Sequence, residues 1–198
     1  MKNLNDYDDE VFLFNKIIEI KCIDDLVVRR NEVLKIKQYF KGFSADISPF
    51  AEFLNIPVFP HKYFGVFISQ GAKIGENCCI FQQVTIGSNL LLDSKSFGYP
   101  TIGNNCYIGA GAKIIGNCII GDNVRIGANA VVYKDVPSNS VVTGATMHVT
   151  QKSEKLDNNY YAHDPIKGWA YKRDGKWFRD LADKVLSKLD TLRSGRNI

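Results

Sequence analysis

Isoleucine recurs every six residues through the middle of this chain. One run is Ile68, Ile74, Ile80 and Ile86, and a second is Ile102, Ile108, Ile114, Ile120, Ile126 and Val132. A small or branched residue stands four places after each of them, as at Ala72 and Val84. This period fits neither an amphipathic helix nor an alternating strand. It predicts a hexapeptide-repeat prism, in which three short strands form one coil and stacked coils bury the isoleucines.

The pattern changes on both sides of the repeat. Residues 1–42 carry apolar side chains at three- and four-residue spacing, which predicts helices, with Asp24 or Asp25 as the cap of the second one. Residues 43–65 are aromatic and interrupted by prolines, and we expect them to form an imperfect first coil. We therefore divide the chain into a helical segment at 1–42, a prism at 43–145 and a tail at 146–198.

One connection interrupts the prism. Between Ile86 and Ile102 the isoleucine spacing widens to sixteen, and residues 88–100 (SNLLLDSKSFGYP) are expected to leave the prism as a loop. Such a loop is either a tolerated insertion or a functional element. On the second interpretation, the apolar residues of the loop reach a neighbouring subunit and close a site. These residues are Leu91, Leu92 and Phe97.

The tail has a different pattern again. The segment GWAYKRDGKWF predicts a β-hairpin that turns at Asp174-Gly175. The following residues predict an amphipathic helix, whose apolar face is Leu181, Val185, Leu189 and Leu192. We expect this face to pack on the prism.

Composition excludes several classes of function. The net charge is +4 and the basic residues are scattered, which argues against a nucleic-acid partner. No apolar stretch is long enough for a membrane span, and the acidic start MKNLNDYDDE lacks the apolar core of a signal peptide, so a cytoplasmic protein is expected. The five cysteines form no C-x-x-C pair, which argues against a zinc site or a disulfide framework.

Histidine is scarce, and this makes His61 stand out. The three histidines are His61, His148 and His163, so none lies within residues 66–145 and no metal site is predicted in the coils. His61 directly precedes the first regular coil and is a candidate general base. Asp46 lies fifteen residues earlier and could orient the imidazole.

Long segments of the repeat resemble a known family. The segments ISQGAKIGENCCIFQQVTIGS, PTIGNNCYIGAGAKIIGNCIIGDNVRIGANAVV and KDVPSNSVVTG are similar to hexapeptide-repeat acetyltransferases, in the serine acetyltransferase branch that includes sugar and polysaccharide O-acetyltransferases. The resemblance implies a mainly β fold, a left-handed parallel β-helix. In that branch a D-I-x-P element precedes the catalytic histidine by fifteen residues, as Asp46 precedes His61 here. It therefore implies that His61 acts as general base, with Asp46 as its partner.

The same resemblance implies acetyl-CoA as cosubstrate, bound in a groove between the prisms of a homotrimer. On that pattern the cofactor path is lined by Ser88, Asn89, Gly109, Ala110, Gly111, Ala112 and Ala128. Arg125 is expected near the CoA phosphates, with Lys134 and Lys152 as weaker candidates. A tight prism corner would need the glycines and alanines in any case.

The sequence departs from serine acetyltransferases at the acceptor side. Their Arg-His pair before the restarting proline is Gly98-Tyr99 here, and the residue before His61 is Pro60 instead of aspartate. Loss of the cationic pair predicts a sugar acceptor, which would stack on the aromatic residues Tyr99, Tyr63 and Phe97.

The main prediction is therefore an acetyl-CoA-dependent O-acetyltransferase acting on a hydroxyl of a sugar or surface-polysaccharide intermediate. Two alternatives stay open. One is serine O-acetylation in cysteine biosynthesis, for which the terminal Ile198 could dock in cysteine synthase. The other is a trimeric scaffold without catalytic activity.

Overall fold

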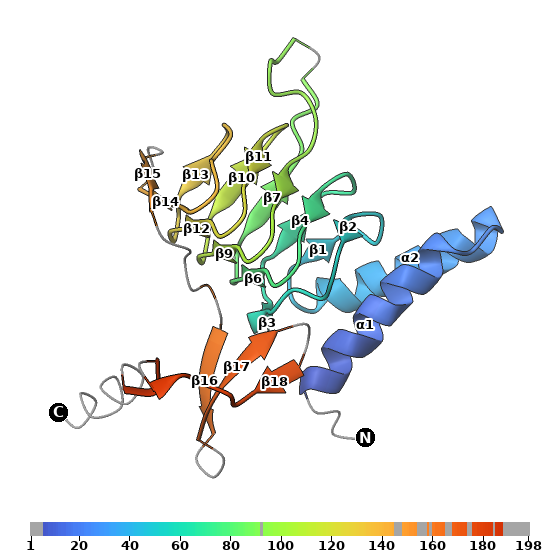
Figure 1. The fold of residues 1–198 in the computed structure, drawn as a ribbon. Helices are drawn as coiled ribbons and strands as arrows, with labels where there is room; N and C mark the ends of the chain where they lie inside the picture. The colour runs from blue at the N-terminus through green and yellow to red at the C-terminus, as the bar shows by residue number, and fades with distance from the viewer. Residues whose placement is uncertain are drawn as a thin grey trace.

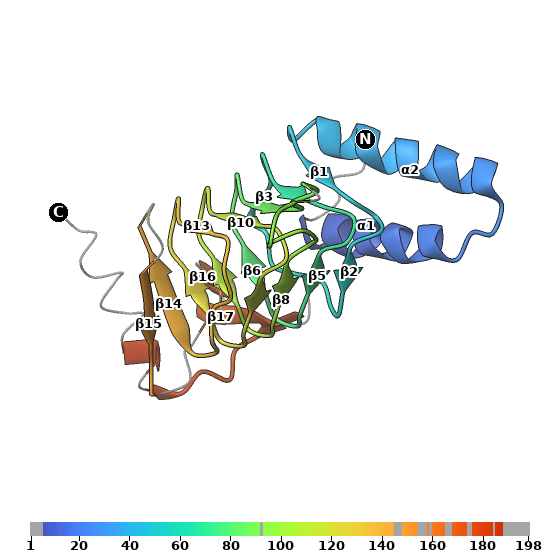
Figure 2. The same ribbon diagram turned by 90° about the horizontal axis from the view of Figure 1, so that it is seen from above.

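Two helices lead into a prism of short parallel strands, followed by a tail with a small antiparallel sheet (Figure 1). This computed structural model describes residues 6–91, 93–144, 148–153, 158, 160–164, 168–173, 176–183 and 185–187. Figure 2 shows the coils stacked along one axis, with the helices at one end and β15 at the other.

The helices are α1 (Asp6–Lys21) and α2 (Leu26–Lys41). The Asp25 carboxylate caps α2, because it accepts the N–H groups of Val27 and Val28 at 2.8 and 2.9 Å. Both helices cover the first coil with aromatic side chains. Phe14 of α1 packs edge-on against Phe53, and Phe40 of α2 is fully buried. The open end of the prism core is closed in this way.

Three parallel sheets form the faces of the prism. Face A consists of β1 (Asp46–Ile47), β4 (Phe67–Ile68), β7 (Thr85–Gly87), β10 (Lys113–Ile115) and β13 (Val131–Val132). Face B consists of β2 (Glu52–Phe53), β5 (Lys73–Ile74), β8 (Thr101–Ile102) and β11 (Ile119–Ile120). Face C consists of β6 (Cys79–Ile80), β9 (Tyr107–Ile108), β12 (Arg125–Ile126) and β14 (Ser140–Thr143). The strand β3 (Pro60–Tyr63) lies between faces C and A of the first two coils.

The strand register places the predicted isoleucines in three columns inside the prism. On face A, Ile68 pairs with Ile86 and Ile114 with Val132, while on face C Ile80 pairs with Ile108. Every member of the two predicted runs is at most 2% exposed. Each coil therefore covers the apolar side of its neighbour, and the predicted parallel β-helix is confirmed.

Asparagines turn the chain at the corner between faces B and C. Asn77, Asn105, Asn123 and Asn139 all have positive φ angles, which asparagine adopts more readily than most residues. Their side chains also bridge successive coils, since Asn77 Nδ2 donates to Asn105 Oδ1 at 3.3 Å.

Residues 88–100 leave the prism between β7 and β8 as an extended loop (Figure 1). Two backbone hydrogen bonds between Asn89 and Gly98, at 2.8 and 2.9 Å, close its base. Leu91 and Phe97 are exposed on the loop, and Leu92 lies outside the described residues.

The tail begins with β15 (His148–Gln151), which pairs antiparallel with β14. Its small sheet is β16 (Tyr160–Asp164), β17 (Gly168–Arg173) and β18 (Lys176–Phe178). The hairpin predicted at Asp174-Gly175 matches the pairing of β17 with β18, although the two turn residues lie outside the described part of the chain. Of the predicted helix, residues 183 and 185–187 are helical, and Leu189, Leu192 and Ile198 fall outside the described residues.

Candidate active site

His61 lies exposed on β3, where the chain passes from face C to face A. Just before it, Val58 bridges to Cys79 of face C, and just after it the carbonyl of Phe64 accepts the N–H of Gln83 at 2.7 Å. The imidazole ring lies 5.7 Å from the ring of Phe81. His61 therefore projects from the prism edge with one flank against an aromatic ring and the remainder open to a ligand.

The edge that carries His61 continues up the prism as a column of backbone hydrogen bonds. The N–H of Gly111 donates to Gln82 at 2.9 Å, and the N–H of Asn129 donates to Ala110 at 2.8 Å. We call this column the C–A edge, and it comprises residues 61–65, 81–84, 109–112 and 127–130. It brings four of the predicted cofactor residues into line with His61: Gly109, Ala110, Gly111 and Ala128. The prediction that Ala112 lines the cofactor path is wrong for this structure, because its side chain is 0% exposed in the prism core.

The glycines of the C–A edge are also required by the prism itself. A Cβ on Gly109 would lie 2.7 Å from the backbone nitrogen of Ala128. Gly111 has a φ of +71°, and a Cβ there would collide with the Asn129 side chain. The glycines at this edge thus serve packing, whereas Ala110 is half-buried and Ala128 is exposed, so these two are accessible to a ligand.

The other predicted cofactor residues lie on different parts of the prism. Arg125 is exposed on face C, next to the C–A edge, and its Nη2 is 3.5 Å from Asn158 Oδ1. Lys134 follows β13 toward face B, with its ammonium 5.5 Å from the Tyr133 ring centre. Ser88 and Asn89 stand at the base of the loop, on the far side of face A from the C–A edge. Exposed Lys152 follows β15.

A polar pocket lies on face A at the base of this loop. Its volume is about 230 Å³, and it includes the predicted residues Asp46, Ser88 and Tyr99. The polar side chains that sequence analysis did not single out are Lys37, Ser48, Ser69 and Gln70. We call it the face-A pocket.

Asp46 and His61 do not contact each other within the described residues. The carboxylate of Asp46 lies 3.4 Å from the ammonium of Lys37 on α2, whereas His61 faces Phe81. His61 is also absent from the residues that line the face-A pocket. The predicted orienting role of Asp46 therefore has no contact to support it within one chain.

The three predicted acceptor aromatics have different environments. Tyr99 lines the face-A pocket, and Phe97 is 45% exposed on the loop. Tyr63 is 2% exposed, and its ring packs against Phe40 and Phe59 at 5.3 and 4.9 Å. The prediction that Tyr63 stacks on an acceptor is therefore wrong for this structure, because its own core covers the ring.

Sequence reasoning missed Lys37 for a physical reason. It stands in an ordinary amphipathic pattern, and only the docking of α2 beside β1 brings it to Asp46. Ser69 was missed because it follows Ile68 as an unremarkable small residue. No local pattern marks either one.

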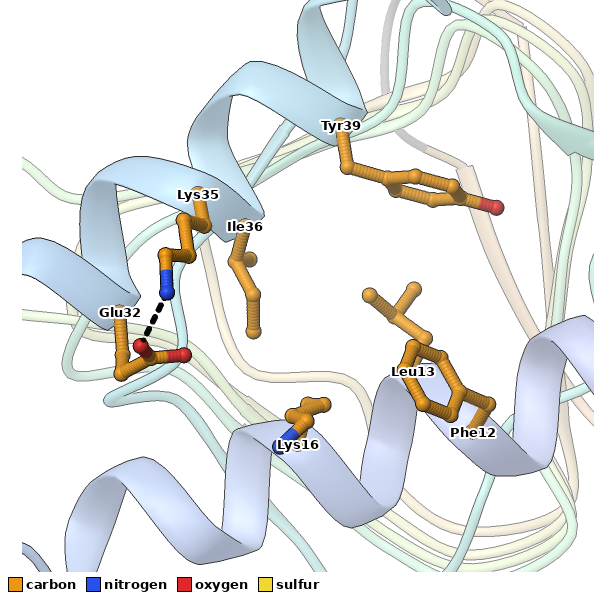
Figure 3. Close-up of a pocket in the computed structure, with 7 residues that line it drawn as sticks. All are labelled: Phe12, Leu13, Lys16, Glu32, Lys35, Ile36 and Tyr39. Carbon is orange, nitrogen blue, oxygen red and sulfur yellow. Dashed lines mark hydrogen bonds and ion pairs between the residues drawn. The ribbon is translucent and has the colours of Figure 1, made fainter.

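A larger cavity, of about 290 Å³, lies between α1 and α2 (Figure 3). Its walls are mainly apolar, including Phe12, Ile36 and Tyr39, and it includes none of the predicted site residues. The charged pair at its rim joins Glu32 and Lys35, 2.6 Å apart and one helical turn from each other.

The cysteines of the prism are unsuited to nucleophilic catalysis. Burial raises the pKa of Cys118 to about 11. The hydrogen bond with Cys78, together with burial, raises the pKa of Cys106 well above its usual value. Both thiols therefore stay neutral near pH 7, and a neutral thiol is a poor nucleophile. Within the described residues no group of three or more His, Cys, Asp or Glu is placed to hold a metal ion.

Comparison with known proteins defines the class. Residues 99–134 match the family described as bacterial transferase hexapeptide (six repeats). In this segment and in its prism, the chain is similar to the hexapeptide-repeat transferases.

Its relatives within this class are serine acetyltransferases. The enzyme of Staphylococcus xylosus is 36% identical over 138 residues, covering 68% of this chain and 62% of that protein. The enzyme of Synechococcus elongatus is 44% identical over 96 residues, covering 48% and 38%. The crystal structure of Neisseria gonorrhoeae serine acetyltransferase in complex with serine matches with a TM-score of 0.59 and 27% identity, covering 70% of this chain and 54% of that chain. The chain thus spans less than two thirds of each. Across the described residues, no helix has the length and apolar character needed to cross a membrane.

Proposed function

We propose that the chain is an acetyl-CoA-dependent O-acetyltransferase whose acceptor is serine. The observation that carries this proposal is the exposed His61 at the start of the C–A edge, on a prism whose relatives are serine acetyltransferases. The edge offers small residues for a long, narrow cosubstrate, and the face-A pocket offers a polar site for a small acceptor.

The proposed reaction is a direct transfer. The imidazole of His61 removes the proton of the serine hydroxyl, and the oxygen forms a bond to the thioester carbon of acetyl-CoA. Backbone N–H groups would stabilise the oxyanion of the tetrahedral intermediate. Its collapse breaks the carbon–sulfur bond, and the leaving CoA thiolate takes the proton from the imidazolium. No acyl-enzyme is required, in keeping with the neutral buried thiols.

Acetyl-CoA would lie along the C–A edge, with its thioester beside His61 and its phosphates toward Arg125. Arg125 is exposed on face C next to this edge. Lys134 lies toward the opposite side of face A, so it is a weaker candidate for the same cosubstrate molecule.

The separation of His61 from the face-A pocket supports a site shared between subunits. In one chain the pocket lies on face A and includes Phe67, whereas His61 lies at the C–A edge and is absent from the pocket lining. A homotrimer in which the C–A edge of one copy meets the face-A pocket of the next would complete the site. Mass measurement in solution tests this, because a monomeric active enzyme would contradict it.

Serine is better supported than the sugar acceptor predicted above, because the relatives are serine acetyltransferases. Tyr99 on the pocket wall is the observation that still favours a sugar. A scaffold without catalysis would have no use for an exposed histidine or for a polar pocket, and this prism carries both. Docking of Ile198 in cysteine synthase and a cytoplasmic location remain predictions.

Release of CoA from acetyl-CoA tests the function. The acceptors would be L-serine, nucleotide sugars, amino sugars and oligosaccharides, with mass spectrometry of the products. We expect O-acetylserine, and we expect His61→Ala to lower kcat by about 10²- to 10⁴-fold. His163→Ala on β16 is the control. If only a sugar is acetylated, the acceptor is a sugar and not serine. If CoA binds but no acceptor is acetylated, the scaffold is supported.

A further inference from the structure

We propose that Lys37 and Asp46 recognise the two charged groups of an amino-acid acceptor in the face-A pocket. The Lys37 ammonium binds the carboxylate of the acceptor, and the Asp46 carboxylate binds its ammonium group. This inference rests on the proposed function and adds the residues that select the acceptor.

The charges of the pocket match a zwitterion. Among the described residues that line it, two are charged, one of each sign, and their charged atoms lie 3.4 Å apart. The remaining polar side chains carry hydroxyls and one amide, from Ser48, Ser69, Ser88 and Tyr99, and Gln70. A ligand with one positive and one negative group would satisfy both charges, whereas a phosphorylated sugar would bring two or more negative charges to one lysine.

A buried hydroxyl without a partner points to the same ligand. Ser69 is 6% exposed and lines the pocket, and its Oγ has no hydrogen-bond partner within the described residues. Most buried side-chain polar atoms in native proteins are paired, so this hydroxyl is expected to bond a bound molecule or an ordered water. A polar acceptor seated between Lys37 and Asp46 would supply that partner.

The size of the pocket favours a small acceptor. Its volume of about 230 Å³ accommodates an amino acid with a few waters. Pockets for drug-sized ligands span about 300–1,000 Å³. A nucleotide sugar belongs to that larger range, and the pocket would hold one part of it at most.

The ion pair can open at little cost. The Lys37 and Asp46 side chains are 49% and 45% exposed, and pairs of this kind contribute little to stability. The Asp46 backbone is held by its N–H, which donates to Val66 at 3.0 Å. The carboxylate therefore keeps its place while the flexible lysine moves to the acceptor.

Substrates that lack one charge isolate each contact. L-serine methyl ester keeps the hydroxyl and the ammonium group but has no carboxylate. We expect Lys37→Met to raise KM for L-serine by about 10- to 100-fold, as loss of a charge-assisted hydrogen bond does, and to change KM for the ester little. Lys35→Met is the control, since Lys35 is on the same helix and pairs with Glu32 outside this pocket.

Asp46 and Ser69 give complementary variants. Asp46→Asn is expected to raise KM for L-serine and for its ester, since both carry the ammonium group, and to leave N-acetyl-L-serine unaffected. If Asp46 instead orients His61, kcat falls for all three, and that overturns the assignment of Asp46. Ser69→Ala is expected to raise KM several-fold, as loss of one neutral hydrogen bond does.

Binding separates this inference from the proposed function. L-serine affinity would be measured by calorimetry for wild type, Lys37→Met and Lys35→Met. Suppose that wild type acetylates L-serine. If Lys37→Met binds L-serine as tightly as wild type, or weakens the serine and the ester to the same extent, the inference fails and the function stands. If L-serine binds, is lost in Lys37→Met and is never acetylated, the inference stands and the function fails. Absence of both binding and turnover overturns both.

Discussion

Ile119 and Ile120 are neighbours on β11 and face opposite ways. Ile119 is 58% exposed on the outside of face B, whereas Ile120 is 1% exposed in the core of the prism. The two residues have the same side chain and the same strand, so they differ in burial alone. Substituting each of them therefore separates the contribution of burial to stability from that of β propensity.

Truncation of the inner residue is expected to be far more damaging. Ile120→Ala should lower the free energy of unfolding by about 2–5 kcal/mol, because it removes buried methyl groups and leaves a cavity between coils. Ile119→Ala should change it by about 0.5 kcal/mol or less. Denaturant unfolding followed by circular dichroism measures both. If both variants lose the same free energy of unfolding, the assignment of Ile120 to the inside and Ile119 to the outside of face B is contradicted.

Gly111 is expected to be required for stability before any role in binding. Alanine there would hold a positive φ at a cost of about 1–2 kcal/mol, and its Cβ would also collide with Asn129. Gly168→Ala is the matched control, because its φ is +77° and no atom of the described residues lies within 4 Å of the added Cβ. We expect thermal unfolding to show a clearly larger loss for Gly111→Ala. If Gly111→Ala loses no more stability than Gly168→Ala, Asn129 on the neighbouring coil moves aside to accommodate the methyl group.

The six-residue period was sufficient to predict the register of all three faces. Each isoleucine must be buried, and a slip of one residue would turn every one of them outward. For this reason Ile80 could be expected opposite Ile108 from the sequence, and the structure confirms it. The asparagine corners follow from the same logic, because the turns between strands need positive φ angles at fixed positions.

The site was less predictable, because it depends on where non-repeating segments dock. The spacing between Asp46 and His61 suggested a contact, yet the residue that pairs with Asp46 on the next coil is Phe67. His61 comes ahead of Phe67, on β3 at the C–A edge, and its ring meets Phe81 instead of Asp46. Lys37 reaches Asp46 from a separate helix, and no repeat constrains that approach.

The buried thiols predict a loss of stability at high pH. Burial raises the pKa of Cys118 to about 11, so the folded state holds the proton that the unfolded thiol releases near pH 9. A raised pKa in the folded state means that stability is intact below pH 9 and falls between about pH 9 and 11, by up to about 1.4 kcal/mol per pH unit for one group.

Urea unfolding at pH 8 and pH 10.5 measures this effect. Cys118→Ala should lose less stability over that interval than wild type does. Cys22→Ala removes an exposed thiol and should keep the wild-type dependence. If stability declines equally in Cys118→Ala, other groups account for the effect, such as Cys106, whose pKa is also raised.

Asn158 is expected to fasten the tail to the prism. It is 5% exposed, and its Nδ2 donates to the carbonyl of Val124 at 3.3 Å and also to that of Asn105, where the chain leaves the B–C corner for face C. Asn158→Ala would remove both donors and leave these carbonyls without them, at a cost of about 1–3 kcal/mol. The loss should also loosen the segment that follows β15, because Asn158 anchors that segment to the B–C corner, whereas β15 itself stays paired with β14. Limited proteolysis with mass spectrometry is therefore expected to show faster cleavage after residue 151, alongside a lower Tm. Ser153→Ala, an exposed change in the same part of the tail, should leave both unchanged. If Asn158→Ala is cleaved at the same rate as wild type, the small sheet of β16–β18 holds the tail without this amide.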